Sequence, residues 1–327
     1  VWQKWRAEGI ETGSRIHEGL RHGVTRALLE LGSGFIKARA NTALREKIED
    51  GRFSKEDFYK ELLRIVYRFL FLFTIEERGL LFQQTDDAEM RKKAERYQNG
   101  YSMARLKDIC LRRNRYDRYS DLWQGVQIVF SALREGDENL ALPGLGGIFS
   151  KEACLELESC KLENYYLLSA IKGLRWALID NRLNLVDYQN MGTEEFGSIY
   201  ESLLELVPVI DLASMSFSFV GIDSETGSKA GNARKTTGSY YTPDSLVQEL
   251  VKSALVPLIK EKEVSGPDAI LSLKIIDPAC GSGHFLLAAA RRIAESHAEA
   301  LGGKADYQHS LRLVINKCIY GVDLNPM

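Results

Sequence analysis

The chain has 327 residues and a formal net charge of −2, with 45% hydrophobic and 27% charged residues. This length accommodates two domains, or one domain and part of another, and the composition is that of an ordinary soluble globular protein. A near-neutral chain carries no overall signature of nucleic-acid binding. The five cysteines and five histidines have no metal-ligand spacing, so we expect no zinc or other metal site.

The most apolar run of the chain, Phe69–Ile75, lies between Arg68 and Glu76. A membrane helix needs about 20 apolar residues, so this run predicts a core helix, and we expect no membrane association. An odd number of cysteines without a visible signal peptide favours a reducing, cytoplasmic compartment.

Residues 1–220 predict an α-helical N-terminal domain. Apolar residues spaced three and four apart indicate helices over 1–31 and 35–49, with a break between them at Gly32-Ser33-Gly34. Ser54 stands where an N-cap would begin a longer helix, which becomes apolar on all sides from Phe69 onward. A helix of that kind belongs at the centre of a bundle.

The pattern changes after this helical region. Two further helices are expected over 151–178 and 194–206, and residues 221–236, rich in Gly, Ser and Thr, predict a flexible linker. A strand is then indicated over 273–277. The change from helix after helix to strand–helix–strand predicts that residues 237–327 are the start of an α/β domain.

The most informative segment, 275–295, indicates a strand that leads through a loop of small residues into a helix. Two β-branched apolar residues precede Asp277, and Gly281 and Gly283 lie in the loop. Such glycines let backbone N–H groups approach a ligand at the carboxyl end of a strand, where open α/β sheets bind cofactors. The dinucleotide fingerprint would need Gly or Ala at position 286, where this chain has Leu286.

Two flanking segments complete a recognisable order of motifs. Tyr-Thr-Pro lies within 238–251, Asp-Pro-Ala-Cys-Gly-Ser-Gly follows from Asp277, and Val-Asp-Leu-Asn-Pro lies within 319–327. This order resembles the amino-proximal part of N6-adenine DNA methyltransferases, especially the large type IIG-like enzymes of restriction–modification and phage-defence systems. The resemblance covers residues 238–327, and a weaker likeness to the helical leader of those proteins extends over much of the rest.

The resemblance implies a Rossmann-like methyltransferase domain that binds S-adenosylmethionine through nine residues. The residues that match the motif over the methionine end of the cofactor are Tyr241, Thr242 and Pro243. Those that match the loop cradling the methionine moiety are Asp277, Ala279, Cys280, Gly281 and Gly283. Asp323 matches the acidic residue that accepts hydrogen bonds from the ribose hydroxyls, a usual role for a carboxylate at the end of the second strand.

The sequence departs from the family in two ways. The interval from Asp277 to Asp323 is much longer than the roughly 20 residues of a minimal βαβ unit, which indicates a helical insertion with helices over 284–299 and 306–317. The family's catalytic motif, Asn/Asp-Pro-Pro-Tyr/Phe, does not occur in the sequence. We therefore expect no catalytic residue here, and we interpret the chain as an inactive N-terminal fragment of a larger enzyme.

Residues 91–120 are strongly basic, with ten lysines and arginines against three acidic residues and several tyrosines between them. The resemblance implies that double-stranded DNA is the substrate of the full-length protein, and this segment could track its phosphates. The candidate DNA-binding residues are Arg112, Arg113, Arg115 and Arg118, with Arg234 and Lys235 before the Tyr-Thr-Pro motif. The alternative is a solvated helical face with ordinary ion pairs.

Other interpretations remain open at this point. Cys280 is an alternative nucleophile, but no His–Asp arrangement near it supports activation. The same cofactor fold also serves methyltransferases that act on RNA or protein. A non-enzymatic helical interaction module is a further alternative, and the resemblance leaves open a nuclease or target-recognition domain in the parent chain.

Overall fold

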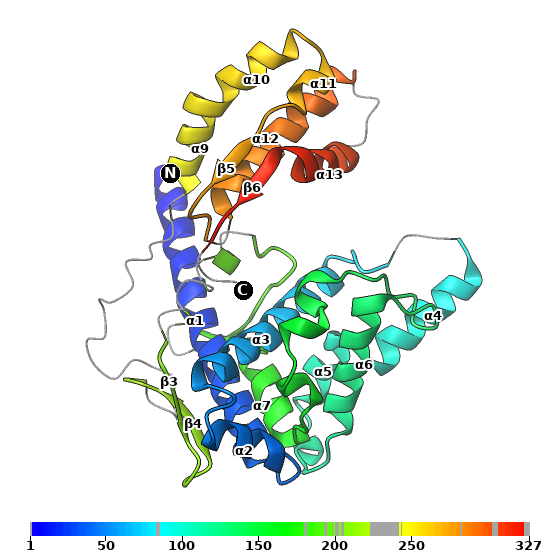
Figure 1. The fold of residues 1–327 in the computed structure, drawn as a ribbon, viewed down its shortest axis with the longest axis vertical. Coiled ribbons are helices and arrows are strands. Elements are labelled where there is room, and N and C mark those ends of the chain that lie inside the picture. The colour runs from blue at the N-terminus through cyan, green and yellow to red at the C-terminus, as the bar shows by residue number, and fades with distance from the viewer. Residues whose placement is uncertain are drawn as a thin grey trace. The chain divides into compact units, whose positions relative to one another are not determined.

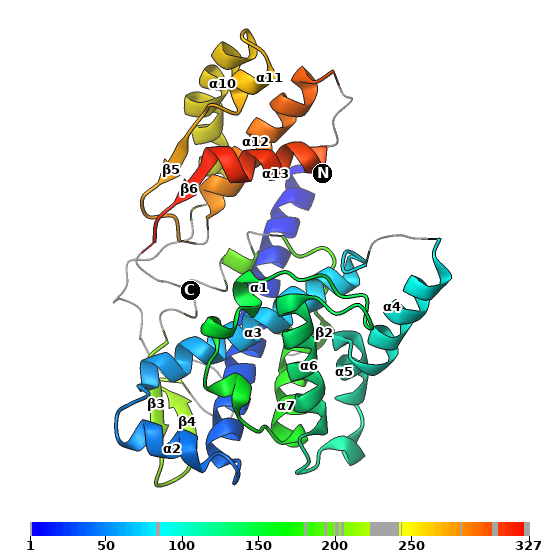
Figure 2. The ribbon, with the colours of Figure 1, turned by 45° about the vertical axis from the view of Figure 1, so that its right-hand side comes forward.

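The computed structural model describes residues 2–82, 86–179, 182–192, 195–197, 199, 203, 206–222, 242, 244–281, 283–302 and 307–323. The chain divides into two compact units (Figures 1 and 2). The first comprises residues 1–191 and 202–236, and the second comprises residues 192–201 and 237–327. None of the described helices is both long enough and apolar enough to cross a membrane.

The first unit is built mainly of helices. In chain order these are α1 (Trp2–Lys37), α2 (Thr42–Glu49), α3 (Lys55–Glu77), α4 (Ala88–Gly100), α5 (Met103–Ile109), α6 (Asp121–Glu135) and α7 (Asn164–Arg175). Single 3₁₀ turns lie at Arg113–Arg115, Gly147–Phe149, Lys151–Ala153 and Leu157–Ser159. The predominantly helical leader that the sequence predicts is thus confirmed.

Helix α3 begins and packs as its sequence predicts. The hydroxyl of Ser54 caps it by accepting a hydrogen bond from the Asp57 N–H at 3.0 Å. Its middle is buried on most sides, and even Arg68 is fully buried. The Arg68 guanidinium donates to the Glu158 carboxylate at 2.7 Å and to the Ile148 carbonyl at 2.7 Å. A buried cation is tolerated because these partners replace its water.

The expected break at Gly32-Ser33-Gly34 is wrong, because α1 continues through it to Lys37. A Cβ on Gly32 would lie 2.4 Å from the ring of Phe217, and one on Gly34 would lie 2.6 Å from the Leu162 side chain. These glycines therefore serve close packing and leave the helix intact. The α-helical conformation costs glycine only about 1 kcal/mol relative to alanine, and such packing offsets this cost.

The first unit also contains two antiparallel hairpins that an all-helical expectation missed. They are β1 (Trp176–Ile179) with β2 (Arg182–Leu185), and β3 (Pro208–Asp211) with β4 (Ser216–Phe219). The expected helix over 151–178 is correspondingly reduced to α7. In β4, Phe217 and Phe219 are buried and alternate with serines, and their rings contact those of Phe58 and Tyr59 in α3. Of the helix expected over 194–206, the described residues 195–197, 199 and 203 are helical.

The second unit follows the predicted order closely. Its elements are α9 (Asp244–Leu250), a π-helical turn (Val251–Leu255), α10 (Val256–Glu263), α11 (Pro267–Ile270), β5 (Ile275–Asp277), α12 (His284–Ala300), α13 (Tyr307–Cys318) and β6 (Ile319–Gly321). The two helices expected between Asp277 and Asp323 are confirmed. Strands β5 and β6 pair in parallel, with Ile275 opposite Ile319 and Asp277 opposite Gly321.

The core of the second unit lies between α12, α13 and the π-turn–α10 segment. Fully buried Ile293, Ala294 and Val314 are at its centre. The buried His297 of α12 shares a hydrogen bond of 3.0 Å between its Nδ1 and the Ser310 hydroxyl of α13. The described residues of this unit contain one parallel strand–helix–helix–strand crossover. A complete Rossmann-like sheet therefore stays a prediction.

Candidate functional site

The loop after β5 is held against the end of β6 by main-chain hydrogen bonds. The Val322 N–H donates to the Asp277 carbonyl at 2.9 Å, and the Cys280 N–H donates back to the Val322 carbonyl at 2.9 Å. These bonds continue the strand pairing beyond the last paired residues, Asp277 and Gly321. The loop and the carboxyl end of the second strand therefore form one structural piece.

Glycines shape this loop in two places. Gly281 and Gly283 have φ angles of +50° and +77°, in the left-handed region that glycine adopts most readily. The Gly283 N–H donates to the Cys280 carbonyl at 2.8 Å, and its own carbonyl accepts from Leu287 at 2.8 Å in the first turn of α12. The loop thus turns sharply and feeds directly into the helix.

Gly321 is a further site residue, which the motif comparison did not single out. A Cβ at this position would lie 2.8 Å from Cδ1 of Leu286 and 2.9 Å from Sγ of Cys280. The close approach of β6 to the loop therefore needs a residue without a side chain. The only signal in the sequence is a glycine two residues before Asp323, which local pattern alone does not distinguish from a turn residue.

Two carboxylates from adjacent strand ends support the loop. Oδ1 of Asp277 accepts the Ala279 N–H at 3.1 Å, and Oδ2 of Asp323 accepts the Gly281 N–H at 2.9 Å. Asp277 is half-buried, whereas Gly281 and Asp323 are exposed. The structure therefore brings together the predicted residues Asp277, Ala279, Cys280, Gly281, Gly283 and Asp323, although a long crossover separates the first five from the last.

The thiol of Cys280 is not activated. Desolvation, together with the nearby carboxylates of Asp323 and Asp277, raises the pKa of this thiol above its ordinary value. A nucleophilic cysteine needs the opposite shift, toward the thiolate. The geometry supports the interpretation that Cys280 packs within the loop.

The segment that carries the Tyr-Thr-Pro motif is described only in part. Thr242 is half-buried, and Tyr241 and Pro243 lie outside the described residues. Directly after the motif, Oδ1 of Asp244 lies 3.3 Å from Nε2 of His284, the first residue of α12. No motif in the sequence marks Asp244. This contact ties the start of α9 to the helix that follows the cofactor loop.

An apolar groove of about 410 Å³ borders the start of the loop. It is lined by α9, the π-turn, α10, the start of α12 and β5, and Asp277 is its one charged residue. Ile276 of β5 has 66% of its surface exposed. Asp277 thus supports the loop and also borders an apolar wall.

These residues fit a ligand that combines a ribose, a cationic centre and an uncharged body. Carboxylates suit a ribose diol and a sulfonium, and the positive-φ glycines keep the loop clear of side chains. The described part of the chain contains no cluster of three or more side chains suited to a metal ion.

The predicted DNA-binding residues are placed separately, in the first unit. Arg112, Arg113 and Arg118 are exposed and Arg115 is half-buried, in and around the turn that follows α5. Arg234 and Lys235 lie outside the described residues.

Comparison with known proteins agrees with the motif order. Residues 227–327 match the family N-6 DNA Methylase. The chain is 29% identical over 147 residues to the adenine-specific methyltransferase PglX of Streptomyces coelicolor, a match that covers 45% of this chain and 11% of that protein. It is 28% identical over 136 residues to a putative type II restriction enzyme and methyltransferase of Methanocaldococcus jannaschii, covering 30% of this chain and 11% of that protein. No solved structure matches the chain.

The matched region, the motif order and the named relatives define one class of protein. Residues 227–327 are thus similar to N-6 DNA methylases, and the two relatives are named as methyltransferases. The chain spans only about a tenth of the length of these curated relatives, 11% in each case.

Proposed function

We propose that the chain is the cofactor-binding part of a site-specific DNA methyltransferase, which transfers a methyl group from S-adenosylmethionine to N6 of adenine. The observation that carries this proposal is the hydrogen bond between Asp323 at the end of the second strand and Gly281 in the loop after the first. It joins the two motifs that the family uses for one cofactor. A restriction–modification or phage-defence system is the setting that the relatives suggest.

Each predicted residue has a distinct part in this proposal. Asp323 accepts hydrogen bonds from the ribose hydroxyls, and the glycines of the Asp277–Gly283 loop let its backbone approach the methionine moiety closely. We assign Tyr241, Thr242 and Pro243 to the methionine end because they match the Tyr-Thr-Pro motif of the family. The two carboxylates also favour the cationic sulfonium by charge complementarity.

The transfer itself needs groups that this sequence does not contain. S-adenosylmethionine, when bound, supplies an electrophilic methyl group. The adenine amino group is a poor nucleophile because its lone pair is conjugated into the ring, so a flipped base must be positioned and hydrogen-bonded for attack. In the family that task belongs to Asn/Asp-Pro-Pro-Tyr/Phe. We therefore propose that this chain binds the cofactor and does not methylate DNA by itself, and that it acts in the cytoplasm within a larger protein.

Calorimetric titration of the chain with S-adenosylmethionine tests the proposal. We expect Asp323→Ala to weaken binding at least about tenfold, which is about 1.4 kcal/mol, because the ribose loses its acceptor and the loop loses its brace. Glu261→Ala, at an exposed carboxylate on α10, is the matched control and should bind like the parent chain. Equal affinity of the Asp323→Ala variant and the parent, or no binding by the parent, would contradict the assignment.

A further inference from the structure

The basic segment 91–120 contains cations of two kinds. Lys107 is paired with Glu77 and lies over the rings of Phe73 and Tyr188, so it is committed to the core. Lys93 pairs with Glu89 at 3.6 Å, and Arg115 lies 3.9 Å from Asp121. Among the other cations of this segment, Arg105, Arg112 and Arg118 form no ion pair with any carboxylate of the described residues. The folded structure therefore distinguishes cations that are engaged by protein groups from cations that are available to an external anion.

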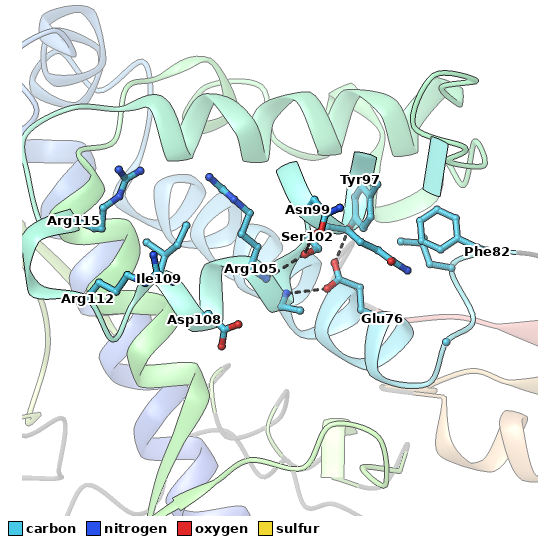
Figure 3. A pocket seen from close by; sticks show the side chains of 14 residues that line it. Glu76, Phe82, Tyr97, Asn99, Ser102, Arg105, Asp108, Ile109, Arg112 and Arg115 are labelled. Carbon is cyan, nitrogen blue, oxygen red and sulfur yellow. Dashed lines mark hydrogen bonds between the residues drawn. The ribbon is translucent and has the colours of Figure 1, made fainter. Parts of the chain in front are cut away.

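Two of the available arginines line a hollow of about 710 Å³ between the end of α3, α4, α5 and the turn after α5. Figure 3 shows Arg105, Arg112 and Arg115 toward one end of this hollow and Glu76 toward the other. The Glu76 carboxylate is already engaged by protein donors. It accepts from the Tyr97 hydroxyl at 2.6 Å and from the Met103 and Ala104 N–H groups at 2.9 and 3.0 Å.

The basic residues that line this hollow are Arg105, Arg112 and Arg115, and its acidic residues are Glu76 and Asp108. Desolvation raises the pKa of Glu76 above its ordinary value, so burial disfavours its charged form. Asp108, the other acidic residue of the hollow, lies 3.4 Å from Arg175. An anion in this hollow meets Arg105 and Arg112, which pair with no carboxylate of the described residues, whereas Arg115 lies 3.9 Å from Asp121.

A second hollow, of about 680 Å³, lies where the end of α1 approaches the start of α6 and α7. Its basic residues are Lys37, Arg39, Arg118 and Lys161, and its one acidic residue is Glu163. All four basic residues are exposed. Lys37 lies over the half-buried ring of Tyr166, 5.8 Å from the ring centre, and this contact supports its aliphatic stem.

A third hollow, of about 330 Å³, shares the lining residue Arg105 with the first and Gln124 with the second. The three hollows are therefore neighbours on the first unit. We call six cations that line them the basic track, which consists of Lys37, Arg39, Arg105, Arg112, Arg118 and Lys161.

We propose that the basic track binds the phosphate backbone of double-stranded DNA. This inference rests on the proposed function for its choice of polyanion, and it adds a contact surface far along the chain from the cofactor loop. Duplex DNA carries one negative charge per about 1.7 Å of helix axis, so a set of six cations, five of them exposed and Arg105 half-buried, matches it better than it matches a small anion.

The lining of the track favours duplex over single-stranded nucleic acid. Single strands are bound largely by bases stacking on exposed aromatic rings. Of the four aromatic residues that line the three hollows, Tyr97 is fully buried and Phe82, Tyr101 and Tyr166 are half-buried, so none of them presents a fully exposed ring. Contacts to phosphates alone position DNA without reading its sequence.

The basic track differs from the set of DNA-binding residues that the sequence predicts. Arg112 and Arg118 belong to both sets. Arg113 lines none of the three hollows, and Arg115 is drawn toward Asp121. Arg105 and the cations contributed by α1 and Lys161 join it, although they lie far apart in the sequence.

The test measures binding of the 327-residue chain to a fluorescein-labelled duplex of about 30 base pairs and arbitrary sequence, by anisotropy between about 50 and 200 mM KCl. The track variant replaces Arg39, Arg105, Arg112 and Arg118 by serine. The control variant removes the same charge from exposed positions of the same unit that line none of the three hollows, by changing Lys92, Arg96, Lys151 and Lys172 to serine. Circular dichroism melting confirms that both variants are folded.

We expect the plot of log affinity against log salt to become shallower by roughly 0.9 per lost phosphate contact, or about 3 to 4 for the track variant, and by less than about 1 for the control. An equal change in both variants, an unchanged slope in the track variant, or no duplex binding by the parent at about 50 mM KCl would overturn the inference. Stronger binding to a single strand or to RNA of the same length would also overturn it.

Titration of the same proteins with S-adenosylmethionine distinguishes this inference from the proposed function. The track variant should keep the cofactor affinity of the parent, and Asp323→Ala should keep its salt slope for DNA. If the basic track passes its test but the parent chain does not bind S-adenosylmethionine, the proposed function alone is refuted. If the parent chain binds S-adenosylmethionine but the basic track fails its test, the track alone is refuted.

Discussion

The two units use the same residue types for different purposes. Gly281 and Gly283 turn the cofactor loop with positive φ angles, whereas Gly23 and Gly32 lie within α1 and let other elements approach it closely. The loop depends on backbone conformation, which adjacent residues largely determine. The helical unit depends on contacts between residues far apart in the chain. The roles of its glycines and cations can therefore be assigned only from the structure.

The largest effect should come from adding one methyl group to the middle of α1. A Cβ on Gly23 would lie 2.3 Å from the Gly173 carbonyl oxygen of α7, so Gly23→Ala forces two helices apart. We expect a loss of about 1–3 kcal/mol in the free energy of unfolding, despite the better helix propensity of alanine. Urea denaturation measures this loss.

Gly125→Ala is the matched control, because this glycine lies in α6 and a Cβ added to it would have nothing within 4 Å. This substitution should raise the unfolding free energy by up to about 1 kcal/mol. If both substitutions stabilise the chain, the two helices do not pack at Gly23 as described.

A smaller and more local effect is expected in the cofactor loop. Gly321→Ala places a Cβ 2.9 Å from Sγ of Cys280 and 2.8 Å from Leu286, so the loop must shift while the core of the unit remains. We expect S-adenosylmethionine to bind about tenfold more weakly, which is about 1.4 kcal/mol. Calorimetric titration measures this effect, and Gly125→Ala should bind like the parent chain. Unchanged affinity of the Gly321→Ala variant would mean that the contact between β6 and the loop does not shape the site.

The smallest effect is a pH dependence centred on His297. Desolvation lowers the pKa of this buried imidazole below its ordinary value of 6.5, so the folded chain favours the neutral form. The unfolded chain therefore binds more protons just below pH 6.5, and folding stability is full above that pH and falls as the pH is lowered. His297→Gln should reduce this fall in urea unfolding measured between about pH 7 and 5.

The exposed His309 of α13 provides the comparison for this experiment. His309→Gln should leave the pH dependence of stability close to that of the parent. If the unfolding free energies of the parent and the His297→Gln variant depend on pH in the same way, protonation of His297 does not contribute to the pH dependence of stability.

Much of the second unit could be predicted from its sequence. The strand before Asp277, both crossover helices and the left-handed turns at Gly281 and Gly283 follow from apolar periodicity and from glycine placement, which are local properties. In the first unit the amphipathic α3 was equally predictable. The hairpins were not predictable from the sequence. The alternation of phenylalanine and serine around Phe217 and Phe219 is short, and these rings are buried only because they pack against α3.

The sequence by itself determined the order of the three motifs and the conformation of the cofactor loop, because steric preferences of neighbouring residues are sufficient for these. Tertiary structure alone decided that Asp323 meets Gly281 across a long crossover, and that Lys107 is committed to the core while Arg105 and Arg112 remain available. Those outcomes depend on which distant groups the fold brings within a few ångströms. Hydrogen bonds and ion pairs act only over such short distances, so local sequence does not encode their partners.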